Sequence, residues 1–330
     1  MSNKVDIREN DIIQYDIQLL KTLLIDRSKP LGKEKYGNII WATDINASMG
    51  DGYGEQDEIT IETISGEHGL VLKPRVAKTK EEQEYRVKDK AEVFTPSWVC
   101  NRQNNLIDNA WFSSENIFNT EIESGWETNT QSIPFPTTDG KSWQDYVKDV
   151  RLEVSCGEAP YLVSRYDTIT GEPIPIQDRI GLLDRKLRVV NENAENEEGW
   201  LEWAQWAFKS IYGFEFQGDN LLLARENLLY TFIDYYEAKF SKMPPKDTLR
   251  KIAVIISWNL WQMDGLKCVI PFSCHEDVSE EFDLWGECTK TVIQCEGCTK
   301  DEMHKHNGIY CKIKDWETGG VVKFISLIKK

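Results

Sequence analysis

Apolar residues recur at helical spacing in several parts of the chain. In residues 9–27 and again in 221–240, isoleucine and leucine lie three and four positions apart, which predicts two amphipathic helices. Opposite charges at short spacing favour a helix over residues 78–90. A further helix is predicted to begin after Pro96 and to continue to Trp111.

Strand patterns alternate with these helices. Ile59–Ile64 alternates apolar and polar residues, which predicts a strand in a region of short strands and turns. Leu152–Val154 and Tyr212–Glu215 are typical of short strands, and Ile252–Trp258 is an apolar run of strand length. Strands separated by helices indicate an α/β fold with a parallel sheet, beginning near Leu152.

Three tryptophans, Trp200, Trp203 and Trp206, recur every third residue. Such a stripe can stack on nucleic-acid bases, or it can be the face of a helix that packs on a core. The core interpretation is favoured, because apolar stripes at helical spacing usually face the interior.

Composition and charge narrow the function classes. The formal net charge is −16 and the apolar fraction is 40%. No apolar run approaches the roughly 20 residues of a membrane helix, and the N-terminus lacks the apolar region of a signal peptide. These features predict a soluble, cytoplasmic protein without a membrane partner. The acidic charge opposes a tight grip on DNA phosphates by this chain alone.

Six of the eight cysteines fall between Cys268 and Cys311. Without a secretory signal, a disulfide framework is not expected. Cys295 and Cys298 are separated by two residues, so both thiolates can reach one metal ion. The spacing C-x20-C-x2-C-x12-C predicts a structural zinc site, with histidines as substitutes for a cysteine that points away; the predicted ligands are Cys274, Cys295, Cys298 and Cys311, and the substitutes are His275, His304 and His306. Reduced cysteines without a metal are the alternative.

Small and acidic residues follow the predicted strands. After Leu152–Val154 comes a turn with Cys156, Gly157 and Ala159, where small side chains let the backbone approach a ligand. Glu215 ends the second strand, where a carboxylate can accept hydrogen bonds from both hydroxyls of a ribose. Asp219 competes for that role or caps the following helix. Asp264, which precedes Gly265, is as consistent with a tight turn as with a ligand-binding role.

Taken in order, four segments resemble the S-adenosylmethionine-binding half of adenine-specific DNA methyltransferases of restriction–modification systems. They are Val93–Pro96, residues 151–163, Tyr212–Glu215 and Trp261–Gly265. The resemblance implies a Rossmann-like methyltransferase core, with an incomplete sheet as one option. It divides the chain into a helical and mixed N-terminal region (1–92), the cofactor-binding core (93–266) and a zinc-ribbon-like cysteine-rich segment (267–330).

The resemblance also implies roles for single residues. Glu153 would orient the methionine end of the cofactor beside the Cys156–Gly157 turn, and Glu215 would hold the ribose. Asp264 would receive the adenine amino group, with Trp261 or Met263 against the ring. The segment ahead of the first strand would close over the cofactor; it contributes Phe94, Thr95 and Pro96. The sequence departs from the family pattern at Ala159, where a second glycine is usual, at Pro160, and in an insertion between Tyr161 and Tyr212.

The loop that performs methylation in this family, of the Asn-Pro-Pro-Tyr type, does not occur in these 330 residues. The one Pro-Pro pair, in Met243–Lys246, lacks polar and aromatic flanks and is expected to end a helix. Three hypotheses follow. The chain is the S-adenosylmethionine-binding subunit of a split methyltransferase, with a partner chain that supplies the catalytic loop and contacts DNA. Alternatively, it is a catalytically inactive methylase remnant, or a zinc-stabilised protein-interaction module.

Overall fold

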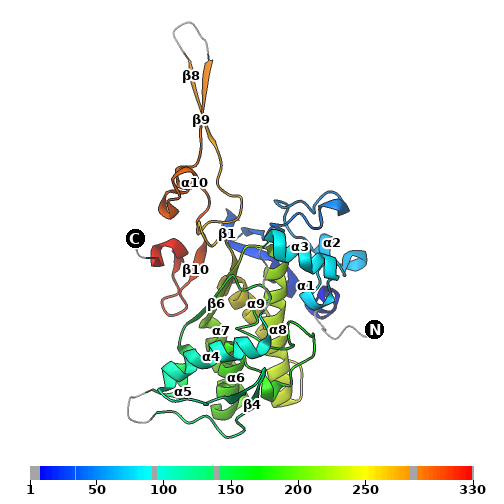
Figure 1. Cartoon of the computed structure of the whole chain (residues 1–330), viewed down its shortest axis with the longest axis vertical. Coiled ribbons are helices and arrows are strands. Elements are labelled where there is room, and N and C mark those ends of the chain that lie inside the picture. Colours follow the sequence, from blue (N-terminus) through cyan, green and yellow to red (C-terminus); the bar gives the residue numbers. More distant parts are fainter. Residues whose placement is uncertain (1–7, 34, 91–94, 137–140, 283–287, 329–330) are drawn as a thin grey trace.

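The computed structural model describes residues 8–33, 35–90, 95–136, 141–282 and 288–328 (Figure 1). It is a mixed α/β structure of helices and small sheets. In the described ranges, no helix combines the length and the apolar character that a bilayer crossing demands.

A parallel sheet of three strands lies at the centre. Its strands are β5 (Arg151–Val154), β6 (Ile211–Glu215) and β7 (Leu260–Gln262), in the order β5-β6-β7. Leu152 is in register with Tyr212, and Gly213 with Leu260. Because all three strands run in one direction, their carboxyl ends meet at the same edge of the sheet.

Two helices connect each pair of neighbouring strands. Between β5 and β6 the chain forms α6 (Leu182–Asn193) and α7 (Glu197–Lys209). Between β6 and β7 it forms α8 (Gly218–Phe240) and α9 (Lys246–Asn259). Helical crossovers are the usual connection between parallel strands.

The N-terminal elements pack on this unit. They are α1 (Glu9–Leu24), β1 (Ile25–Gly32), β2 (Lys35–Asn38), α2 (Ile61–Ile64) and α3 (Lys80–Lys90). Helix α4 (Ser97–Phe112), the hairpin β3 (Asn119–Ile122) and β4 (Gly125–Thr128), and α5 (Trp143–Lys148) come before the sheet. The helices predicted for residues 9–27, 78–90 and after Pro96 are therefore confirmed with small shifts of their ends.

The cysteine-rich end of the chain forms two antiparallel pairs. The hairpin of β8 (Asp277–Phe282) and β9 (Cys288–Ile293) projects from the rest of the molecule (Figure 1). Helix α10 (Glu296–Lys300) follows it, and β10 (Lys312–Lys314) pairs with β11 (Val321–Lys323).

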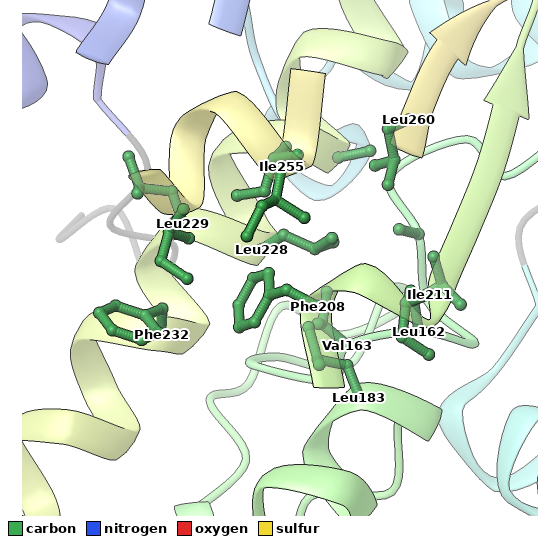
Figure 2. Packing of buried hydrophobic residues seen from close by; sticks show 14 of the residues in the cluster. Leu162, Val163, Leu183, Phe208, Ile211, Leu228, Leu229, Phe232, Ile255 and Leu260 are labelled. Carbon is green, nitrogen blue, oxygen red and sulfur yellow. The ribbon is translucent and has the colours of Figure 1, made fainter. Parts of the chain in front are cut away.

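One large apolar core joins the helices to the sheet. Figure 2 shows Leu228, Leu229 and Phe232 of α8 near Phe208 of α7 and Ile255 of α9. The same cluster contains fully buried leucines of α1, so it extends across the predicted boundary at residue 92.

The tryptophan stripe lies on α7 and faces this core. Trp200 is fully buried, and its ring centroid lies 5.6 Å from that of Phe232. Trp203 and Trp206 are half-buried and pack against the same cluster. The core interpretation of the stripe is therefore confirmed for Trp200.

Two strand predictions are wrong. Ile252–Trp258 lies within helix α9, and the third strand starts only at Leu260. An apolar run has no periodicity that separates a buried helix from a buried strand. Ile61–Ile64 is helical, because a capping box stabilises its N-terminus. The Thr60 hydroxyl accepts a hydrogen bond from Thr63 N–H, and the Thr63 hydroxyl accepts one from Thr60 N–H.

Candidate functional site

The predicted ribose carboxylate bridges the first two strands of the sheet. Glu215 Oε2 accepts a hydrogen bond from the backbone N–H of Gly157 at 2.9 Å, and Oε1 accepts one from Gln217 N–H at 3.1 Å. Burial raises the pKa of Glu215 to about 6, although these N–H groups oppose the shift. The structure therefore brings together two predicted site residues, Gly157 and Glu215.

The turn after β5 has an uncommon backbone. Ser155, Gly157 and Ala159 all have positive φ values, of 50°, 53° and 64°. This left-handed region costs little for glycine but is unfavourable for residues with a Cβ. Ala159, the departure from the family pattern, thus occupies a conformation that suits glycine. Strained residues of this kind cluster at ligand sites.

Glu153 in β5 and Cys156 in this turn are both buried. Oε1 of Glu153 accepts a hydrogen bond from Tyr161 N–H at 3.4 Å, while Oε2 has no hydrogen-bond partner within the described part of the chain. Burial raises the pKa of Glu153 well above its usual range, and it raises that of the Cys156 thiol as well. The backbone N–H of Cys156 donates to the carbonyl of Phe214 at 2.8 Å.

The segment predicted to close over the cofactor is only partly described. Phe94 lies outside the described residues. Pro96 is the N-cap residue of α4, and the carbonyl of Thr95 accepts a hydrogen bond from the Thr168 hydroxyl at 2.9 Å. Thr95 also interacts with Tyr161, which places it near the turn after β5.

A cavity of about 460 Å³ opens beside Asp264. Its lining comes from segments far apart in the sequence, namely Gln56, Phe216, Asp264, Lys267, Val269, Phe272, Cys274 and Cys298. The predicted flanking residues Trp261 and Met263 are not in this lining; both are fully buried in a second apolar cluster.

Asp264 forms the turn that its sequence also predicted. Its Oδ1 accepts hydrogen bonds from the N–H groups of Leu266 and Lys267 at 3.1 and 3.2 Å, and its Oδ2 lies 3.5 Å from Lys267 Nζ. Two aromatic lining residues were not anticipated. Phe216 directly follows Glu215, a position that signals proximity to the site, whereas nothing in the sequence marked Phe272.

Four side chains of the cysteine-rich segment form a compact group. The ligand atoms of Cys274, Cys295, Cys298 and His306 all lie within 4.8 Å of one another. Each sulfur is 3.6 Å from Nδ1 of His306. In tetrahedral zinc coordination, with bond lengths of about 2.3 Å to sulfur and about 2.0 Å to nitrogen, the two kinds of ligand atom lie about 3.5 Å apart. The group can therefore hold a metal ion.

The surroundings of the group favour a cation. Burial raises the pKa of Cys295, but this is outweighed by hydrogen bonds from backbone N–H groups, that of Asn307 first, and the pKa falls to about 6. Burial and the neighbouring sulfurs raise the pKa of Cys274 to about 12. A bound divalent ion would relieve this repulsion between thiolates. Gly297 lets the chain pass close to His306, since a Cβ there would lie 2.6 Å from its Nδ1.

The prediction that Cys311 is the fourth metal ligand is wrong. Cys311 is fully buried outside the group, and its thiol donates to the carbonyl of Gln262 in β7 at 3.2 Å. His306, one of the predicted substitutes, takes its place. His275 instead lies 3.3 Å from a carboxylate oxygen of Asp277, and neither it nor His304 belongs to the group.

Comparison with known proteins adds no assignment. No family model matches the chain, and neither a curated protein nor a solved structure matches it. The function must therefore be inferred from the residues and their geometry.

Proposed function

We propose that this chain is the S-adenosylmethionine-binding subunit of an adenine-specific DNA methyltransferase of a restriction–modification system. Its core would be Rossmann-like, and the catalytic loop would come from outside these residues, on a partner chain. The observation that carries the proposal is the bond between Gly157 N–H and the Glu215 carboxylate. It joins a glycine turn after one parallel strand to an acid at the end of the next, the position at which such folds bind nucleotides.

The Glu215 carboxylate retains capacity for a ribose. Its oxygens accept hydrogen bonds from the backbone N–H groups of Gly157 and Gln217, and the backbone N–H of Phe216 also interacts with the carboxylate. Because a carboxylate offers about four lone-pair sites, a ribose hydroxyl can donate to it without breaking these contacts.

Glu153 suits the cationic amino group of the methionine end. A buried carboxylate with one unpartnered oxygen is costly by itself, and a nearby ammonium offsets that cost. The adenine end is supported by the cavity beside Asp264, which has two aromatic walls, Phe216 and Phe272. Its volume falls within the range of small-ligand sites.

The need for a partner is supported by the edge of the sheet and by charge. Within the described residues β5 pairs only with β6, and Val150, Leu152 and Val154 next to or on this edge are exposed by 64%, 44% and 64%. An open, apolar edge of this kind invites pairing with another chain. A basic partner would also offset the net charge of −16 in a complex with DNA.

The group of three cysteines and His306 is assigned to a structural zinc ion. Protein atoms would fill all four positions around a tetrahedral ion, which is typical of structural rather than catalytic sites. Metal analysis of the purified protein should find one zinc per chain, and Cys295→Ser should lose it. A wild-type chain without bound zinc after purification in zinc-containing medium would contradict the assignment.

Calorimetric titration with S-adenosylmethionine tests the cofactor proposal. The wild-type chain should bind, and Glu215→Ala and Asp264→Ala should weaken binding at least tenfold. Glu202→Ala, an exposed carboxylate on α7, is the matched control and should bind as the wild type does. Absence of binding to the wild type would refute the cofactor proposal and leave the zinc-stabilised interaction module, which the projecting β8–β9 hairpin favours.

Methylation separates the active subunit from an inactive remnant. The chain co-expressed with the product of the adjacent gene should transfer labelled methyl groups to adenine-containing DNA, whereas the isolated chain should not. Transfer by the isolated chain would show that the catalytic loop is not supplied by a partner.

A further inference from the structure

The cavity beside Asp264 and the metal group share a wall. Cys274 and Cys298 belong to the metal group, and both line the cavity. We infer that a zinc ion at this group fixes that wall and so controls the affinity of the cavity for an adenosine-containing ligand. The inference rests on the proposed function, and adds a metal-dependent control of the same site.

The two shared residues lie on separate parts of the chain. Cys274 precedes strand β8, and Cys298 lies in α10 beyond strand β9, so the whole projecting hairpin separates them. A bound ion would join these two parts directly across the base of the hairpin. The relative positions of Cys274 and Cys298 in the cavity wall would then be set by the ion rather than by the conformation of the hairpin.

A series of backbone hydrogen bonds and one bond to a tyrosine side chain connects the metal group to Asp264. The N–H of Asp264 donates to the carbonyl of Val269 at 2.8 Å, and the next residue, Ile270, donates to Ile309 at 2.9 Å. The neighbouring Tyr310 accepts a hydrogen bond from His306 N–H at 3.0 Å through its hydroxyl. His306 does not line the cavity, yet its backbone is therefore linked to the loop that carries the candidate adenine acceptor.

The segment between Asp264 and the first metal ligand is held in an unfavourable conformation. Cys268 and Phe272 both have φ values of +59°, a region that suits glycine. Phe272 provides an aromatic wall of the cavity, and its ring contacts that of Phe216 edge-on at 5.7 Å. Anchoring Cys274, two residues later, restrains Phe272 in this conformation.

The decisive experiment compares the zinc-loaded chain with the chain after chelation. Both are titrated with S-adenosylmethionine and with adenosine, while circular dichroism monitors the helical core. Zinc removal should weaken both ligands at least tenfold. His306→Ala should reproduce this loss, and His304→Ala, which replaces an exposed histidine outside the group, should not.

Thermodynamic linkage supplies a second measurement on the wild-type protein. If zinc raises ligand affinity tenfold, the ligand must raise zinc affinity by the same factor. Competition with a chromophoric chelator, with and without saturating S-adenosylmethionine, measures that factor directly. Equal zinc affinities with and without S-adenosylmethionine would overturn the coupling, whether or not the zinc-free chain stays folded.

The outcomes separate this inference from the proposed function. Ligand binding that is equal with and without zinc, together with unchanged zinc affinity, would overturn the coupling and leave the cofactor site intact. If the zinc-loaded chain fails to bind either ligand, both the proposed function and this inference are refuted.

Discussion

The affinity for adenosine should depend on pH through Glu215. Two features define the expectation: the carboxyl group contacts Gly157 and Gln217 N–H groups, and burial raises its pKa to about 6. Ribose hydroxyls donate to the ionised carboxylate, whereas the protonated acid has a proton of its own on one oxygen. Affinity should therefore be highest above the pKa and should fall as the pH is lowered through it.

The magnitude follows from the ionised fraction. With a pKa of about 6, roughly 97% of Glu215 is ionised at about pH 7.5 and roughly 9% at about pH 5. If only the ionised form binds, the dissociation constant rises about tenfold between these two pH values. That ratio corresponds to about 1.4 kcal/mol.

Adenosine is the appropriate ligand because it lacks the methionine end. The pKa of Glu153 is also raised, and its titration would alter the affinity for S-adenosylmethionine but not for the nucleoside. Calorimetry across this pH range should show the tenfold change for the wild type and a flat, weaker profile for Glu215→Gln. A wild-type affinity that stays constant within twofold would refute the assignment of Glu215 to the ribose.

Three predictions concern the stability of the fold. Burial raises the pKa of Asp26 from 3.8 to about 6, so the folded state loses about 3 kcal/mol as the pH rises through this window; urea titrations of Asp26→Asn should show that this loss is absent. Gly218→Ala places a Cβ 1.9 Å from the carbonyl oxygen of Ile40 and should cost about 3 kcal/mol, whereas Gly199→Ala, with 3.5 Å to its nearest atom, should not destabilise. Trp200→Ala, at a fully buried position, should cost about 3–5 kcal/mol in the same assay.

Local patterns in the sequence predicted most of the helices. The stripe of Trp200 and the leucines of residues 221–240 repeat at a period that only a helix satisfies, and the structure confirms both. The strand predicted for Ile252–Trp258 was wrong because its apolar residues are nearly contiguous. They lie in α9, which is buried on more than one face. The strand predicted for Ile59–Ile64 was wrong for a different reason, since the capping box at Thr60 outweighed an alternating pattern of only a few residues.

The candidate site was predictable where the chemistry is local. The pair Cys295 and Cys298 is set by two intervening residues, so its convergence could be expected from spacing alone. The choice between Cys311 and His306 is not local, because it depends on which residue the tertiary fold directs toward β7. Phe272 could not be predicted for the same reason, since its place beside Phe216 is created by the folding of the loop after β7.

The hairpin of β8 and β9 joins the rest of the molecule at the metal group. Six-residue strands extend about 20 Å, and the hairpin begins just after Cys274 and ends just before Cys295 (Figure 1). Its cross-strand pair of Val278 and Val292, each more than half exposed, lies along its length. A metal ion bound at the base of the hairpin would fix the orientation of the hairpin. The surfaces that this hairpin can contact would then be set by an ion bound at its base.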